Sequence, residues 1–281
     1  ENKVAKKNLE ALNLERQGKT PPSNRMTEIV KGFEEAVGEP LQQSSETTVS
    51  KALIARGTAM FRQGKTDVAR RFFEQALANC PNSVQAHSAL GVVLGTAGDI
   101  DGQIKEEKSA LALDPKNVSV ICNLAWAQAQ KGLLTDSLKT YQKALAIDPK
   151  SMDAQVGQGV VLFRMDKFEA AVAVLRECAR VNPDAARTHL ALGAILQAVG
   201  RVDEAVTELE LSAKLSPNNV ESRTRLAAAY LALENYPKAL DLYRQLVERV
   251  PSDAELRVGY ALSLTKTDDM AGAAIQFRKA L

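Results

Sequence analysis

Aromatic residues, histidines and cysteines are all scarce in this chain of 281 residues. Aromatic side chains make up 5% of it, with one tryptophan, and there are two histidines and three cysteines. Cys80, Cys122 and Cys178 lie far apart, without the CxxC spacing of a zinc site or the even number that a disulfide framework needs. We therefore expect no metal and no other cofactor, and we interpret the cysteines as small apolar fillers.

Long apolar runs and an excess of one charge are also missing. No stretch reaches the roughly 18 uninterrupted apolar residues of a membrane-spanning helix. We therefore expect no transmembrane segment and a soluble chain, in the cytoplasm or the periplasm. The 36 basic and 34 acidic residues leave a formal net charge of +2, which gives no overall field to attract a polyphosphate backbone, so we do not expect nucleic acid as a partner.

The stretch RQGKT occurs twice, at residues 16–20 and 62–66, and ends like a phosphate-binding loop. Such a loop needs a second glycine five residues before GKT, so that backbone N–H groups surround the phosphates. Asn13 and Ala59 occupy that place in the two copies. Neither copy therefore fits a nucleotide site, and the recurrence requires another explanation.

Prolines provide that explanation, because six of them recur at a spacing of 34 residues without an insertion or deletion. They are Pro81, Pro115, Pro149, Pro183, Pro217 and Pro251. Proline lacks the N–H that a further helical turn requires, so each one predicts the end of a helix. With the abundance of Ala and Leu, this period predicts an all-α chain of repeated helix pairs.

Short polar residues and glycines divide each unit into two helices. Five residues just after the prolines predict helix N-caps, and Ala185 is the exception: Ser83, Asn117, Ser151, Asn219 and Asp253. Midway between prolines we expect a turn at Gly64, Gly98, Gly132 and Gly200, with Asp166, Glu234 and Asp268 in the other three units. The second GKT is therefore interpreted as the turn between two helices.

The first 49 residues do not follow this period closely. Residues 4–16 and 26–37 are expected to be helical, with a turn at Gly18 and an end before Pro40. We interpret residues 1–49 as an N-terminal helical segment, either a degenerate repeat or a cap.

This pattern resembles the tetratricopeptide repeat, a 34-residue helix-turn-helix unit with small residues at fixed places and a proline near its end. Seven units follow from Ser50: 50–83, 84–117, 118–151, 152–185, 186–219, 220–253 and the truncated 254–281. The eighth place of each unit is small, from Gly57 to Ala261. The twentieth and twenty-seventh places are small too, except that Gln103 departs from the pattern at the twentieth and Leu246 at the twenty-seventh. The resemblance implies an α-solenoid, a right-handed superhelix of antiparallel helix pairs.

In that family, partners lie in a concave groove lined by the first helix of each unit, near places 2, 5, 6, 9, 12 and 13. The resemblance implies a protein or peptide partner with apolar anchors and some acidic residues, bound in the groove of a non-catalytic scaffold for complex assembly. Trp126 is the candidate anchor, although packing between neighbouring helices would explain it equally well. The candidate binding residues are Phe61, Arg62, Asn123, Trp126, Phe163, Arg164, Arg187 and Arg225.

No residue pattern indicates catalysis. His87 and His189 lie three repeats apart in matching phrases, HSALG and HLALG, which favours a structural role for both. The carboxylates follow solvated helix faces. Three alternatives to the scaffold remain: a regulatory or targeting arm of a larger enzyme whose catalytic domain is absent here, an RNA-binding repeat array, and self-association through the groove or the open end.

Overall fold

A computed structural model describes residues 48–281, and within them every regular element is a helix. The helices expected at residues 4–16 and 26–37, and the first copy of RQGKT, lie outside the described residues. The first helices of successive units are α3 (Thr48–Arg62), α5 (Val84–Thr96), α7 (Val118–Gln130), α9 (Met152–Arg164), α11 (Ala186–Ala198), α13 (Val220–Ala232) and α15 (Ala254–Lys266). The second helices are α4 (Thr66–Asn79), α6 (Ile100–Leu113), α8 (Leu134–Ile147), α10 (Phe168–Val181), α12 (Val202–Leu215), α14 (Tyr236–Arg249) and α16 (Met270–Ala280).

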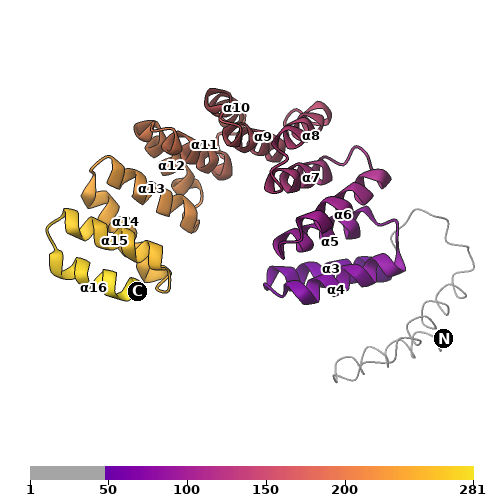
Figure 1. The fold of residues 1–281 in the computed structure, drawn as a ribbon, viewed down its shortest axis with the longest axis horizontal. Coiled ribbons are helices and arrows are strands. Elements are labelled where there is room, and N and C mark those ends of the chain that lie inside the picture. Colours follow the sequence, from indigo (N-terminus) through magenta and orange to yellow (C-terminus); the bar gives the residue numbers. More distant parts are fainter. Residues whose placement is uncertain (1–47) are drawn as a thin grey trace, which may run out of the picture. The chain divides into compact units, whose positions relative to one another are not determined.

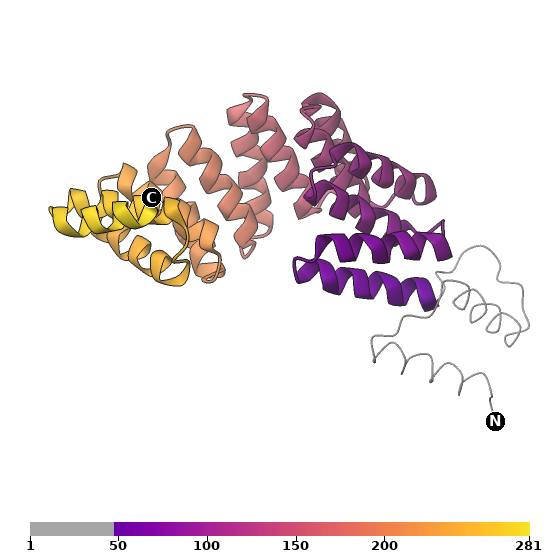
Figure 2. The ribbon, with the colours of Figure 1, turned by 60° about the horizontal axis from the view of Figure 1, so that its bottom comes forward.

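Helices pack in chain order from α3 to α16. Each first helix contacts the second helix of its own unit and the first helix of the next unit, and each second helix contacts the following first helix. The colours of Figure 1 therefore run in sequence from the indigo pair α3 and α4 to the yellow pair α15 and α16, and Figure 2 shows the pairs side by side. This arrangement is the expected α-solenoid of antiparallel helix pairs.

Helix starts and turns follow the predicted residues. Each of the five predicted caps accepts a hydrogen bond from the backbone N–H three residues later, at 3.0–3.4 Å, whereas Ala185 offers no side-chain cap. All seven predicted turn residues have positive φ, from 74° to 90° at the glycines and from 57° to 63° at Asp166, Glu234 and Asp268. The non-glycine residues pay a steric cost at these angles, because Cβ approaches the backbone.

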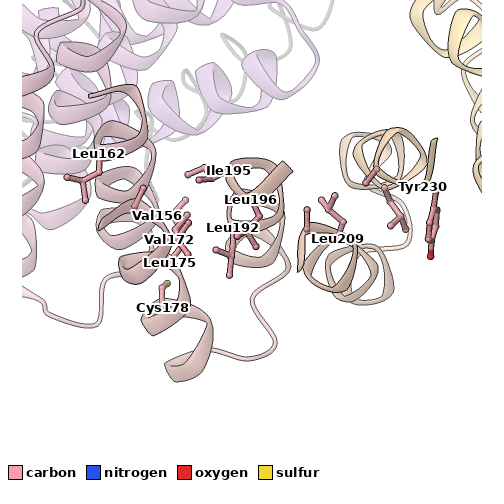
Figure 3. Close-up of a cluster of buried hydrophobic side chains, with 14 of the residues drawn as sticks. Val156, Leu162, Val172, Leu175, Cys178, Leu192, Ile195, Leu196, Leu209 and Tyr230 are labelled. Atoms are coloured by element: carbon pink, nitrogen blue, oxygen red, sulfur yellow. The ribbon is translucent and has the colours of Figure 1, made fainter. Parts of the chain in front are cut away.

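The core runs along the stack between first and second helices. Its largest cluster joins units four to six, with Leu175, Leu192, Leu196 and Leu209 almost completely buried (Figure 3). Numbering places from the first residue of each unit, place 24 holds a buried residue in units one to six and an exposed phenylalanine in the last unit. It is occupied by Phe73, Glu107, Tyr141, Leu175, Leu209, Tyr243 and Phe277.

A glycine makes room for each large side chain at place 24 in units one and three to six. In units one, four and five it is place 8 of the same unit; a methyl group at Gly159, for example, would lie 2.7 Å from Leu175 Cγ. In units three and six place 8 is alanine, and the tyrosine instead lies against place 6 of the next unit. A methyl group at Gly157 would lie 2.2 Å from the ring of Tyr141. The small residues therefore not only let two backbones approach but also leave room for the large side chains at place 24.

One packing expectation is wrong. Its place in the repeat predicts that Phe277 fills a gap between helices, as Phe73 does in unit one, yet Phe277 is 37% exposed. Within residues 48–281, α16 packs on α15 and no later helix covers its other side. The two departures from the small-residue pattern, Gln103 and Leu246, are both buried.

Candidate partner-binding groove

The first helices form one continuous surface, because each of them contacts the next first helix along the stack. At its N-terminal end this surface holds a hollow of about 330 Å³. The hollow is lined by Lys51, Ile54, Ala55, Thr58, Ala59 and Arg62 of α3 and by Gln85 of α5. These residues occupy places 2, 5, 6, 9, 10 and 13 of unit one and place 2 of unit two. We call the side of the first helices that carries these places the groove face.

An apolar line crosses the groove face at place 9. Thr58 of this place lines the hollow in unit one, and the same place holds Val92, Trp126 and Val160 in the next three units. Val92 is partly buried, Trp126 is 45% exposed and Val160 is 40% exposed. Leu262 of the last unit is exposed as well. Nearly half of the tryptophan surface is therefore open to solvent instead of packed between helices.

The two candidate phenylalanines are more buried than their proposed role on the groove face predicts. Phe61 is partly buried against the core cluster of Leu53 and Ile54. Phe163 packs against the central core, and its ring centroid lies 5.5 Å from that of Phe168. Both side chains therefore contribute to packing as well as to the groove face. Their neighbours Arg62 and Arg164 are exposed.

Two candidate arginines on the groove face form ion pairs. Arg187 of α11 pairs with Asp153, which holds the same place one unit earlier on α9. Arg225 pairs with Glu221, one turn earlier on α13, at 3.1 Å. These side chains are largely exposed, so each pair contributes only about 0–1 kcal/mol. The pairs neutralise part of the positive charge that the candidate arginines bring to this surface.

Asn123 is tied to the neighbouring unit. Its Nδ2 donates a hydrogen bond to Ser88 Oγ of α5 at 3.1 Å, and both side chains are partly buried. Behind them lies Glu107 of α6, which is completely buried and whose two carboxylate oxygens accept no hydrogen bond of good geometry within residues 48–281. Burial raises the pKa of Glu107 to about 8, and weak hydrogen bonding from the side chains of Ser88 and Asn123 opposes this rise only in part.

A second buried acceptor lies one turn before Glu107. Gln103 is 3% exposed, and its Oε1 also accepts no hydrogen bond from the described residues. The amide fits because α5 has glycine opposite: a methyl group at Gly95 would lie 1.9 Å from Gln103 Oε1. The repeat pattern identified Gln103 as a departure from the small residues at its place, but it did not identify Glu107. The signal was available, because Glu107 is an acidic residue at place 24, where the other units have leucine or an aromatic residue.

Both histidines connect elements within the stack. His87 Nδ1 lies 2.7 Å from Glu106 and its Nε2 lies 2.9 Å from the carbonyl oxygen of Pro81. His189 repeats this arrangement with Glu208 and Pro183, at 2.6 and 2.9 Å. Each imidazole thus links the preceding proline turn to the second helix of its own unit, which supports the structural interpretation.

Residues 48–281 contain no cluster of three or more His, Cys, Asp or Glu side chains that could hold a metal ion. The cysteines have no disulfide partner, and burial raises the pKa of the Cys122 thiol to about 11, which disfavours the reactive thiolate. Among the described helices none combines the length and apolar character required to cross a membrane.

The fold and the groove face define a class of protein: a solenoid of 34-residue helix pairs. Sequence profiles of the tetratricopeptide repeat match residues 54–118, 118–151, 153–185, 184–252 and 224–281. The chain belongs to the tetratricopeptide-repeat family.

Solved structures with the same fold are only distantly similar in sequence. Yeast Tom70 matches with a TM-score of 0.67 at 18% identity, over 93% of this chain and 56% of its own. Pseudomonas aeruginosa pilF matches with a TM-score of 0.60 at 21% identity, over 77% of this chain and 97% of its own. A chain of the APC/C hetero-tetramer Cut9-Hcn1 matches with a TM-score of 0.60 at 19% identity, over 83% of this chain and 42% of its own. No curated protein matches the sequence.

Proposed function

We propose that residues 48–281 form a non-catalytic scaffold that holds a segment of a partner protein on the groove face and so supports complex assembly. Tetratricopeptide-repeat proteins generally mediate protein-protein interactions. A similarly folded chain is part of the Cut9-Hcn1 hetero-tetramer, which agrees with this role.

The observation that carries the proposal is the exposure of Trp126. A tryptophan that leaves 45% of its surface in water forgoes part of the free energy that burial provides. Aromatic side chains of this size dominate the energy of protein interfaces once a partner covers them. Trp126 also lies at place 9, between Val92 and the exposed Val160, so its neighbours extend the apolar surface.

The chemistry of the partner follows from the groove face. Val160 and Leu262 require apolar side chains opposite them, spaced along a helix or an extended segment. Lys51 and Arg62 surround the hollow at the N-terminal end, and Arg164 is exposed further along. Acidic residues on the partner would complement these cations and increase its association rate.

Substitutions on and off the groove face test the proposal. Trp126→Ala and Arg164→Glu change the groove face, whereas Leu113→Ala and Lys108→Glu change exposed residues of α6, a second helix. In quantitative affinity capture we expect the first two variants to lose the same partner and the controls to retain it, with equal helicity by circular dichroism. Retention of every partner by both groove variants would refute the assignment.

A further inference from the structure

The buried acceptors of α6 lie beneath the groove face next to Trp126. Glu107 faces Ser88, at place 5 of α5, and Asn123, at place 6 of α7. Trp126 follows Asn123 by three residues on α7 and therefore lies on the same side of that helix. The hydrogen bond between Asn123 and Ser88 bridges the two first helices in front of the carboxyl group.

This arrangement replaces the packing found at the same place in the other units. Leucine or an aromatic residue occupies place 24 elsewhere, and each large side chain in units one and three to six is matched by a glycine. Gly91 still faces Glu107, since a methyl group there would lie 3.1 Å from Oε1. Place 6 of the following unit, which is glycine after each tyrosine, is here the polar Asn123. Where units two and three meet, therefore, the polar side chains of Glu107 and Asn123 stand in place of the large side chain packed against a small residue in units one and three to six.

Three oxygens in this set have no donor in good hydrogen-bond geometry within residues 48–281: both oxygens of Glu107, which Ser88 and Asn123 reach only weakly, and Oε1 of Gln103. Buried oxygens without donors are costly, because they lose their bonds to water without replacement. Gln103 Oε1 is an acceptor and ionised Glu107 offers two more, so a group that satisfies all three at once must supply N–H or O–H bonds. A single carboxylate is too few for a divalent cation, which favours several charged oxygens, whereas one alkylammonium ion supplies three donors and one positive charge.

We propose that Glu107, Gln103 and Asn123 form a polar subsite in the groove floor that receives one lysine side chain of the partner segment. The inference rests on the proposed function, because the subsite opens onto the groove face. Entry requires the Asn123–Ser88 hydrogen bond to open, since Glu107 is otherwise covered. The ammonium group then bonds the carboxylate, and the methylene stem of the lysine lies against the exposed face of Trp126.

The subsite is testable without a known partner, because its reporter is the single tryptophan of the chain. The probe is n-butylammonium, the lysine side-chain analogue, and n-butanol is the uncharged control. We expect saturable changes in Trp126 fluorescence and in the Asn123 side-chain amide resonance with n-butylammonium. We expect binding of n-butanol to be at least tenfold weaker.

Two variants distinguish the effect of the Glu107 carboxylate on binding from the effect of the protein's overall charge. Glu107→Gln keeps the shape of the side chain and should weaken n-butylammonium binding at least tenfold. Glu248→Gln removes a carboxylate from an exposed site on α14, a second helix, and should leave binding unchanged. Binding should also strengthen at least tenfold between pH 6 and pH 9, as Glu107 loses its proton. The charged group that acts on Glu107 is Glu106 on the same helix, and Glu106 in turn contacts His87 of α5.

The proposal is overturned if the unaltered protein shows no saturable response to n-butylammonium at either pH, as expected if buried water alone satisfies the oxygens. Equal binding by Glu107→Gln also overturns it. Either result concerns the subsite only, whereas the groove assignment depends on partner capture by Trp126→Ala and Arg164→Glu. Failure of one proposal is thus distinguishable from failure of the other.

Discussion

Replacing Glu107 should stabilise the protein, and more so as the pH rises. Its folded pKa of about 8 lies well above the ordinary value of 4.5. Below pH 4.5 the carboxyl group is protonated in both states and favours neither. Between pH 4.5 and 8 the unfolded chain releases the proton while the folded chain retains it, so the free energy of unfolding falls as the pH rises. Above pH 8 both states are ionised and the penalty stays constant.

The size of the effect follows from the pKa difference. Each unit of pKa corresponds to about 1.4 kcal/mol, so the ionisable side chain should lower the free energy of unfolding by about 2–3 kcal/mol between pH 5 and pH 7. Glu107→Gln cannot ionise and should escape this loss. Glu107→Leu should stabilise the protein further, because Leu175 and Leu209 fill the same place opposite Gly159 and Gly193.

Urea denaturation at several pH values, followed by circular dichroism, measures the difference between each variant and the unaltered protein. Subtraction removes the titration of all other groups, as long as they are independent of Glu107. Glu248→Gln, which changes an exposed carboxylate of α14, is the control and should show no pH-dependent difference. A constant difference between Glu107→Gln and the unaltered protein from pH 5 to pH 8 would show that the buried carboxyl does not have a raised pKa.

Three further substitutions probe the repeat geometry by denaturation. Glu234→Gly should stabilise the protein by about 0.5–1 kcal/mol, because a residue at φ 57° then no longer needs to accommodate Cβ; no gain would argue against strain in this turn. Ala185→Ser should add the side-chain cap that α11 lacks and about 1 kcal/mol, and an unchanged stability would show that α11 does not need it. Gly259→Ala should cost about 1–3 kcal/mol, since the added methyl group lies 2.3 Å from the ring of Tyr243; combination with Tyr243→Leu should recover part of this cost, and a simple sum of the two losses would refute the proposed fit.

Local chemistry made the helix boundaries predictable from the sequence. A proline ends a helix and a serine or asparagine caps one through bonds to its immediate neighbours, so letters such as Pro149 and Ser151 suffice. The turn at Glu234 was predicted by its place in the period, although its residue type disfavours a positive φ. In each case the deciding contacts lie within about four residues.

Burial on the groove face was harder to predict, because it depends on the next unit. Place 12 points toward the groove or the core according to what the neighbouring helices leave open, so Phe163 is partly buried against Phe168. The polar set around Glu107 was missed for a different reason. The residue at place 24 packs against place 8 of its own unit or place 6 of the following unit, so the polar set becomes visible only when the three residue types are compared together. The sequence analysis considered each small place alone.

The position of Glu107 has a consequence for how the solenoid holds a partner. The stability of a linear repeat array is approximately the sum of the stabilities of its units and of the interfaces between neighbouring units. A poorly hydrogen-bonded buried group in unit two therefore weakens that unit and its contacts with units one and three. Units four to six, by contrast, share the largest apolar cluster. Local opening should therefore be easiest beside Trp126, where α5 and α7 are bridged by the Asn123–Ser88 hydrogen bond. A partner that supplies the missing donors would bind this opened unit and at the same time close it. Binding and local stability would then be coupled at unit two.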